Sequence, residues 1–398
     1  MIDQQPLRGV RVLDLTRVLA GPFCTMNLAD LGADVIKIEV PGRGDDSRSF
    51  APVMPSGDSG YFYSVNRGKR SVTLDLHTAE GAAVFLELAA KSDVVVENFS
   101  PGTMARFKIG YAQLKAINPK IILCSISGFG QTGPKASAPA YDIVAQALGG
   151  TMSITGNPGG EPVRCGVSVG DLSAALYGVI AILSALRVRD RDGVGNHVDI
   201  AMLDCQVAML EDALARYSVS GKVPGRLGTR HPSITPFQQF RAADDYFVMG
   251  AGNEAIWLRF CDAVSMPELK DDPRFLTNAD RTANHPELEA ILARVFATAP
   301  RDRWLQLLND ASVPCAPIAN VEEVSRDAHL AARNMILRAE HSSFDGLIVP
   351  GSPLKSVGDT DIPSTSAPRL GESTDEVLAS VLGYDNLRLS ELRKRSII

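Results

Sequence analysis

Asp171 is the residue whose type and position are best suited to covalent chemistry. It follows the segment 166–170, which contains two glycines, and it precedes an apolar run from Leu172 that is expected to form a helix. An aspartate at such a place is most often a helix cap, because its carboxylate accepts a hydrogen bond from a backbone N–H of the first turn. The same helix end favours a charged carboxylate, and its N–H groups can hold developing negative charge. Asp171 is therefore a candidate nucleophile towards an activated acyl carbon as well as a candidate cap.

Two further segments carry residues that could bind a ligand. The sequence Asn66-Arg67-Gly68-Lys69-Arg70 is a basic cluster in an acidic protein. It is either a solvated loop or an anion site, since arginine can hold a carboxylate or phosphate through two parallel hydrogen bonds. Residues 250–253, Gly-Ala-Gly-Asn, are either an ordinary tight turn or a place where the backbone comes close to a ligand.

The sequence lacks the motifs of several other chemistries. The six cysteines form no CxxC pair, and no histidine stands at metal-ligand spacing, so no metal is expected. The turn at 16–22 has no GxGxxG and the chain has no GxxxxGK[ST], which counts against a dinucleotide or P-loop nucleotide. Ser127-Gly128-Phe129-Gly130 does not match the GxSxG elbow of hydrolases.

Composition restricts the class of protein. The chain has 398 residues, of which 45% are hydrophobic and 22% charged, as in soluble globular proteins of two or three domains. The net charge of −6 argues against a nucleic-acid or membrane-surface binder. The start of the chain does not resemble a signal peptide, and the apolar run 174–186 is too short to span a bilayer. We expect a cytoplasmic enzyme with reduced, buried cysteines.

The first half of the chain alternates strands and helices. Strands are predicted at 10–15, 34–39, 71–76, 93–99, 121–125 and 197–201. Helices are predicted at 21–31, 78–91, 111–117, 140–148 and 172–189, and from 201 to about 217. This alternation predicts an α/β fold with a Rossmann-like, doubly wound parallel sheet.

The second half predicts a different organisation. Residues 221–236 are rich in Gly, Pro and Arg and are interpreted as a linker after a large domain at 1–220. A hairpin at 237–241 and 246–250, with helices at 253–264, 285–298 and 302–309, predicts a small α+β domain over 237–320. The segment 321–398 is expected to hold a helix at 322–334, a hairpin around 344–346 and a final helix from 373.

Several stretches together, in order, resemble the family III CoA-transferases. They lie at 13–22, 31–39, 65–71, 97–102, 127–134, 141–142 and 170–171, so that the resemblance runs over nearly the whole chain. It implies that Asp171 is the catalytic nucleophile, forming an aspartyl anhydride and then an aspartyl-CoA thioester. It also implies that segment 321–398 returns to the large domain, and that two chains interlock as a homodimer.

The resemblance also implies which residues bind the substrates. Those matching the site of coenzyme A are Arg17, Val72, Leu74, Asn98, Phe99 and Arg106. Those assigned to the acid are Arg67, Tyr141, Gly250 and Gly252, with Arg67 expected to bind the distal carboxylate of a dicarboxylate. Within the family, the stretches at 21–28, 44–46 and 248–253 are most similar to members that use succinyl-CoA and glutarate. Formyl-CoA:oxalate-type and carnitine-type transfer are the alternatives, and Arg17, Val40 and Pro139 depart from the formyl-CoA pattern.

Two rival interpretations are open. An α-methylacyl-CoA racemase shares the expected fold, but it carries a histidine directly before the aspartate that matches Asp142, and here that residue is Tyr141. Without that base the racemase interpretation is weak. The other rival is a CoA-binding protein without catalysis, and the intact Asp171 counts against it.

Overall fold

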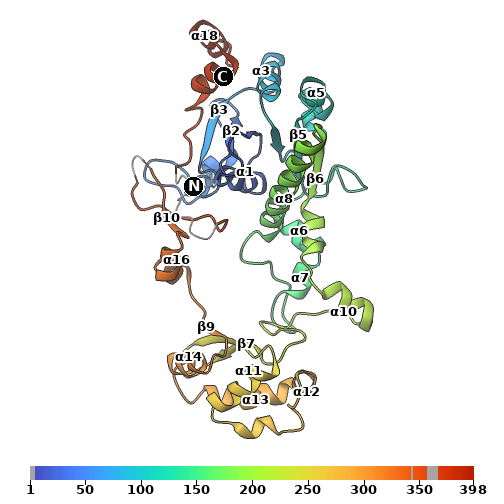
Figure 1. Cartoon of the computed structure of the whole chain (residues 1–398), viewed down its shortest axis with the longest axis vertical. Coiled ribbons are helices and arrows are strands. Elements are labelled where there is room, and N and C mark those ends of the chain that lie inside the picture. Colours follow the sequence, from blue (N-terminus) through green and yellow to red (C-terminus); the bar gives the residue numbers. More distant parts are fainter. Residues whose placement is uncertain (1–4, 342–343, 356–365) are drawn as a thin grey trace. The chain divides into compact units, whose positions relative to one another are not determined.

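A six-stranded parallel sheet is the centre of the fold. The computed structural model describes residues 5–341, 344–355 and 366–398. The strands are β1 (Arg11–Asp14), β2 (Asp34–Glu39), β3 (Lys69–Thr73), β4 (Val94–Glu97), β5 (Ile122–Ser127) and β6 (His197–Ala201). Their order is β3-β2-β1-β4-β5-β6, so the direction of winding reverses between β1 and β4 (Figure 1). This is the doubly wound order, which confirms the predicted Rossmann-like α/β class.

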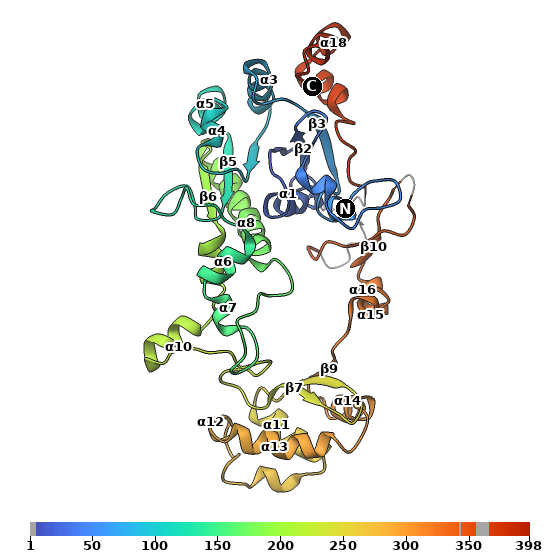
Figure 2. The ribbon, with the colours of Figure 1, turned by 180° about the vertical axis from the view of Figure 1, so that it is seen from behind.

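Helices cover both faces of this sheet. On one face the core contains side chains of α1 (Ala20–Asp30), α6 (Asp142–Leu148), α8 (Val169–Asp192) and α9 (Met202–Ala208). On the other face it contains side chains of α3 (Ala79–Ala90), α5 (Tyr111–Ile117), α17 (Thr374–Leu382) and α18 (Asn386–Lys394). Helix α17 of the C-terminal segment contacts β3 and α3, and Figures 1 and 2 show α18 and the C-terminus in the same part of the molecule. Because both faces are covered, the central strands are apolar on both sides rather than alternating.

The chain divides into two compact units. Unit 1 comprises Met1–Thr151, Cys165–Asp212 and Ser325–Ile398, and unit 2 comprises Met152–Arg164 and Ala213–Val324. Unit 2 contains an antiparallel sheet in the order β7-β8-β9, and its core includes the buried rings of Trp257, Phe260 and Phe296. Its elements are α10 (Ala213–Ser220), β7 (Phe237–Arg241), β8 (Tyr246–Gly250), α11 (Glu254–Ala263), η2 (Pro267–Lys270), α12 (Asn278–Ala283), α13 (His285–Phe296), α14 (Arg301–Asp310) and β9 (Cys315–Pro317).

The remaining elements are short. They are η1 (Asp46–Ser49), α2 (Gly60–Val65), α4 (Thr103–Arg106), α7 (Thr151–Ile154), α15 (Val321–Ser325), α16 (Ala328–Ala332), β10 (Ile336–Arg338) and β11 (Ile348–Pro350). Strands β10 and β11 pair antiparallel on either side of the turn predicted at 344–346, and residues 342–343 of their connection lie outside the described residues.

Some predicted helix boundaries were wrong. Helix α8 begins at Val169 rather than Leu172, so Ser168 is its N-cap residue and Asp171 lies inside the first turn. The helix predicted at 322–334 is two helices, because the Asp327 side chain accepts the Leu330 N–H and caps a new one. The helix predicted up to 217 is likewise divided into α9 and α10. The change at α8 matters most, because it shows that Asp171 is not the N-cap residue of this helix.

Candidate active site

Asp171 lines a cavity of about 290 Å³ at the carboxyl edge of the parallel sheet. The wall of this cavity includes Arg17–Ala20 after β1 and Asn98–Pro101 after β4. These two segments flank the point where the strand order reverses. In doubly wound folds ligands bind at that point, because the connecting helices leave in opposite directions and open a crevice. The topology therefore places Asp171 where a ligand would be expected.

Asp142 holds the backbone that carries Asp171. It is the first residue of α6, and its Oδ1 accepts the Gly170 N–H at 2.8 Å while its Oδ2 accepts the Gln146 Nε2–H at 2.7 Å. A Cβ atom on residue 170 would lie only 2.9 Å from Asp142 Oδ1, so glycine is needed for this close approach. The Gly170-Asp171 pair and Asp142 are thus one structural unit.

The surroundings of Asp171 raise its pKa to about 7, first because the carboxyl is buried and then because the Asp142 carboxylate is nearby. In the described part of the chain no donor bonds the Asp171 carboxylate. A carboxylate with a raised pKa is a stronger nucleophile than an exposed one, and its lone pairs are not committed to another group. Asp171 therefore has the properties of an attacking group.

The turn after β1 is held in an uncommon conformation next to this cavity. Val18 has a φ of +68°, which is a sterically costly value for a β-branched residue, and its N–H donates to Asp45 Oδ1 at 3.1 Å. Arg17 and Asn98 bond reciprocally: the Arg17 N–H donates to Asn98 Oδ1 and Asn98 Nδ2 donates to the Arg17 carbonyl, both at 2.8 Å. These bonds fix the turn against the segment that follows β4.

A second cavity, of about 390 Å³, adjoins the first, and both are lined by Arg17, Phe99 and Ser100. Its wall contains three rings, with Phe107 lying 6.1 Å from Phe99 and 4.8 Å from His77 between centroids. Arg106 also lines it, and its Nη2 donates to Thr103 Oγ1 without an acidic partner among the described residues. Rings beside an available guanidinium suit a flat, phosphorylated ligand.

The two cavities bring together seven of the predicted site residues: Arg17, Leu74, Asn98, Phe99, Arg106, Tyr141 and Asp171. Val72 is not among the lining residues, because its side chain is fully buried in the core under the sheet. Arg67 is also absent from both walls, because its guanidinium is buried against the Asp30 carboxylate. Gly250 and Gly252 belong to unit 2, whereas all residues lining these cavities belong to unit 1.

Tyr61 is a residue near Asp171 that sequence reasoning missed. Burial, followed by the negative charges of Asp171 and Asp45, raises the pKa of Tyr61 to about 12. Its ring packs against Phe50 at 5.6 Å between centroids. The only signal in the sequence is a run of aromatic residues at 61–63, and such a run is more typical of a core, as its neighbours Phe62 and Tyr63 show by being buried.

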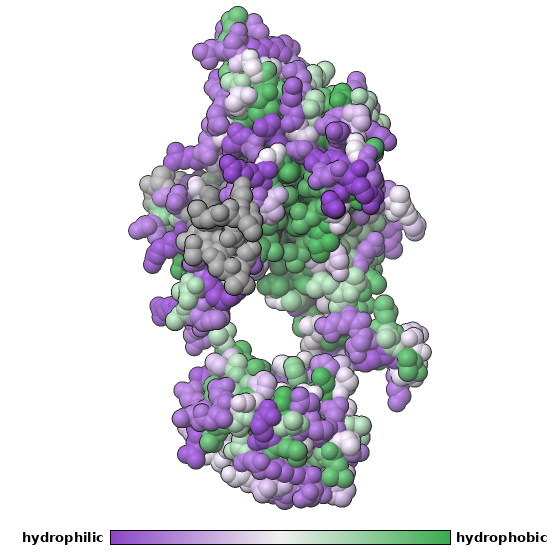
Figure 3. All heavy atoms as spheres, viewed as in Figure 1, coloured by the Kyte–Doolittle hydropathy of each residue, from purple (hydrophilic) through white to green (hydrophobic). Residues whose placement is uncertain are grey.

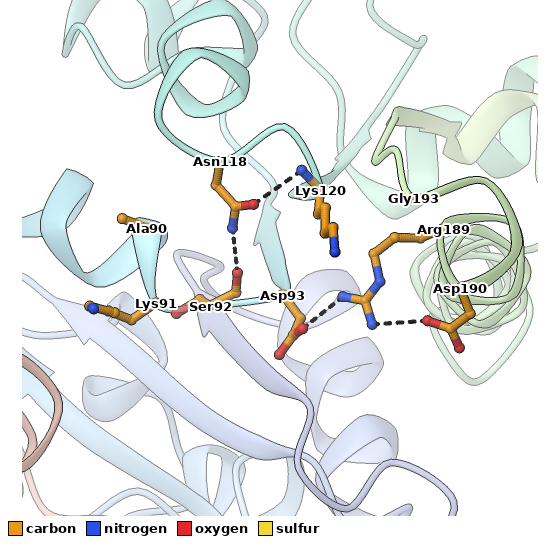
Figure 4. A pocket seen from close by; sticks show the side chains of 9 residues that line it. All are labelled: Ala90, Lys91, Ser92, Asp93, Asn118, Lys120, Arg189, Asp190 and Gly193. Carbon is orange, nitrogen blue, oxygen red and sulfur yellow. Dashed lines mark hydrogen bonds and ion pairs between the residues drawn. The ribbon is translucent and has the colours of Figure 1, made fainter.

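A larger cavity, of about 710 Å³, lies at the opposite edge of the sheet (Figure 4). Its wall includes Ser92 and Asp93 before β4, Lys120 before β5, and Arg189 near the end of α8. Arg189 is paired with Asp93 at 2.7 Å and with Asp190 at 3.3 Å. At ~1.5 Å per residue, Arg189 is about 27 Å from Asp171 along α8. This cavity is therefore distant from Asp171, and Arg189 in its wall is already paired with two carboxylates.

The site therefore consists of a half-buried carboxylate in one cavity and, in the adjoining cavity, three rings beside an arginine. The sequence matches CoA-transferase family III over residues 7–374, and the chain belongs to this family. The acetyl-CoA:oxalate CoA-transferase of Acetobacter aceti is 44% identical over 92% of this chain and 93% of its own length. The human succinyl-CoA:glutarate CoA-transferase is 40% identical over 100% of this chain and 91% of its own. A CaiB/BaiF family protein from Brucella suis has a similar structure, with a TM-score of 0.83, 39% identity, and coverage of 95% of this chain and 100% of its own.

Proposed function

We propose that this enzyme moves CoA from succinyl-CoA to a C4–C6 dicarboxylate such as glutarate, with Asp171 as the covalent nucleophile. The observation that supports the nucleophile is the half-buried carboxylate of Asp171, which no described donor bonds, in the cavity where the strand order of the sheet reverses. Membership of the CoA-transferase family makes an acyl-CoA the donor. Named relatives that act on succinyl-CoA with glutarate or mesaconate, at 39–43% identity, support the choice of acids.

The proposed reaction exchanges one activated carboxyl derivative for another. Asp171 attacks the thioester carbonyl of the donor, the C–S bond breaks, and a mixed anhydride and free CoA thiolate result. The thiolate attacks the Asp171 carbonyl and expels the donor acid, which leaves an aspartyl-CoA thioester. The acceptor carboxylate then attacks the carbonyl of this thioester, the C–S bond breaks, and a second mixed anhydride and CoA thiolate result. The thiolate attacks the acceptor carbonyl of this anhydride, which forms the new acyl-CoA and expels the free Asp171 carboxylate. Because the energy of the thioester is retained, no ATP is needed, but water has to be excluded from the anhydrides.

The shape of the site agrees with this sequence of steps. The second cavity, with Phe99, Phe107 and Arg106, is suited to the nucleotide part of CoA, and the thioester end would then lie in the first cavity, whose wall includes Asp171. Binding of the remote nucleotide can then position the reacting carbonyl. The binding energy gained at the nucleotide end offsets the entropy that is lost when the thioester end is held in one orientation.

A matrix of donors and acceptors tests the proposed pair of acids. With succinyl-CoA and glutarate we expect glutaryl-CoA to form without ATP, at a turnover of about 1–10³ s⁻¹, as measured by mass spectrometry of the CoA esters. Acetyl-CoA, formyl-CoA, oxalate and carnitine serve as competing donors and acceptors. Transfer confined to oxalate would contradict the C4–C6 acceptor, and an absence of exchange with every pair would contradict CoA transfer itself.

We further propose that two chains form a homodimer through the outer face of α8. This helix is long and apolar enough to cross a membrane by length and composition, but half of its apolar window is buried inside the structure. Leu176, Tyr177 and Ile180 on its other face are 50%, 39% and 58% exposed. Figure 3 shows hydrophobic side chains gathered in the region of α8. An exposed apolar face of this kind is typical of a protein interface.

Ile180→Glu is therefore expected to convert the dimer to a monomer, because a charged side chain would be buried without a partner. Light scattering coupled to size exclusion measures the mass of the particle. Leu387→Glu is the matched control, since Leu387 on α18 is 70% exposed and is outside this face. A wild-type protein that runs as a monomer, or equal dissociation of both variants, would contradict the proposed interface.

A further inference from the structure

Arg17 is the one cationic side chain among the described residues that line the Asp171 cavity. The other charged residues of the wall are the carboxylates Asp46, Asp142 and Asp171. A dicarboxylate or its CoA ester that reacts at Asp171 also has a distal carboxylate, and this second negative charge would lie next to the same wall. We propose that Arg17 binds that distal carboxylate and so selects dicarboxylates over monocarboxylates. The inference rests on the proposed function, because it assumes that Asp171 is the point of reaction.

The position of Arg17 suits this role. Both its backbone N–H and its carbonyl are hydrogen-bonded to the Asn98 side chain, so the Cα atom from which the Arg17 side chain extends is fixed beside the cavity. Its guanidinium lies 5.6 Å from the centroid of Phe99, and Nη1 is 3.2 Å from Asp46 Oδ2. The side chain is 45% exposed, and arginine has five N–H donors, of which this contact uses one. The other donors can form charge-assisted bonds to a ligand carboxylate.

Asp46 can release Arg17 without being left unpaired. Its other oxygen, Oδ1, accepts a bond from Arg43 Nη2. Arg43 is 72% exposed and does not line the cavity. A carboxylate ligand can therefore share or replace Asp46 as the partner of Arg17 while Arg43 still neutralises Asp46.

Arg67, the cation expected from the sequence, is not available for this task. Its Nε donates to Asp30 Oδ1 at 3.0 Å and its Nη2 to Asp30 Oδ2 at 2.5 Å, while Nη1 donates to the Pro350 carbonyl at 2.8 Å. Its side chain is only 3% exposed. A substrate would have to break a bidentate pair and leave Asp30 as a buried, uncompensated charge, which is costly.

The phosphates of CoA have a different cation. Arg106 lines the adjoining cavity and has no acidic partner in the described part of the chain. Arg17 is at the junction of the two cavities, on the wall that also contains Asp171. We therefore assign Arg106 to the nucleotide end and Arg17 to the acyl end of the donor.

The test compares donors that differ only in the distal carboxylate. Succinyl-CoA and butyryl-CoA have acyl chains of the same length, and glutarate and pentanoate are the matched acceptors. For Arg17→Met we expect the ratio of kcat/KM for succinyl-CoA over butyryl-CoA to fall by about 10–150-fold, because one charge-assisted contact is lost. The glutarate-to-pentanoate ratio should fall similarly. Arg17→Lys keeps the charge and should restore part of both ratios.

Arg191→Gln is the control, since it removes an exposed cation near the end of α8 that lines neither cavity, and both ratios should stay within about threefold of wild type. If Arg17→Met lowers kcat/KM equally for succinyl-CoA and butyryl-CoA, Arg17 serves CoA and the inference is overturned. Unchanged ratios also overturn it, and in both cases CoA transfer itself still stands. A wild-type enzyme that transfers CoA to or from none of these acids overturns the proposed function instead, and this inference with it.

Discussion

Asp171→Ala is expected to lower the rate of CoA transfer by about 10⁴-fold or more, because no other described carboxylate in the cavity is free to attack the thioester. Asp142 cannot replace it, since its two oxygens are bonded to Gly170 N and Gln146 Nε2. The variant should fold normally, because Asp171 neither caps α8 nor bonds any described group. The rate is measured as loss of succinyl-CoA and gain of the new CoA ester.

A covalent readout separates nucleophilic catalysis from simple binding. After incubation with acyl-CoA and treatment with hydroxylamine, the wild-type peptide that contains Asp171 should change mass, whereas the Asp171→Ala peptide should not. Asp190→Asn is the control, because Asp190 is exposed near the other end of α8 and should leave rate and labelling unchanged. Transfer by Asp171→Ala at more than about a hundredth of the wild-type rate would contradict the covalent route.

Asp14→Ala is expected to lower the free energy of unfolding by about 3–5 kcal/mol, a large part of the ~5–15 kcal/mol typical of a folded domain. Asp14 Oδ2 is 2.9 Å from Lys69 Nζ, and both side chains are completely buried. Burial acts against the charged form, but the charges of Lys69 and Lys37 hold the pKa of Asp14 well below its usual range. Alanine would leave Lys69 as a buried cation whose remaining partners are the neutral oxygens of Pro22 and Asn66.

Chemical denaturation measures this loss, and an exposed ion pair supplies the comparison. Arg393 and Asp375 are joined at 2.6 Å, but their side chains are 55% and 54% exposed, so Arg393→Ala should cost less than about 1 kcal/mol. If Asp14→Ala costs no more than Arg393→Ala, the buried network contributes little to stability. The network also reaches the site, since Lys37 Nζ donates to the Thr16 carbonyl at the start of the turn that carries Arg17.

The sheet and the nucleophile could be predicted from sequence because their signals are local. Strands β2 and β6 and helix α5 have the predicted boundaries, since apolar runs separated by helical patterns define them without knowledge of the tertiary contacts. Helix α8 shows the limit of such reasoning. The sequence predicts Asp171 as a cap or a nucleophile, and only the observed start of α8 at Val169 places it inside the first turn.

The basic cluster at 66–70 shows why side-chain roles needed the structure. The sequence offers two interpretations of this cluster, a solvated loop or an anion site, but Arg67, Lys69 and Arg70 pair with Asp30, Asp14 and Asp34. These partners lie on α1, β1 and β2, 36 to 55 residues away along the chain, and the tertiary fold brings them next to β3 and the turn before it. No local pattern shows such pairing, because a charge run looks the same whether its partners are water or buried carboxylates.

The sequence by itself determined the order of strands and helices, the family and the aspartate that is its candidate nucleophile, since these depend on residue type and spacing along the chain. The tertiary structure decided which charged groups are still available to a ligand. It buries Arg67 and Val72, brings Tyr61 close to Asp171, and leaves Arg17 and Arg106 on the walls of the two cavities. The physical reason is that a side chain's availability depends on which partners the fold places within bonding distance, and those partners come from distant parts of the chain.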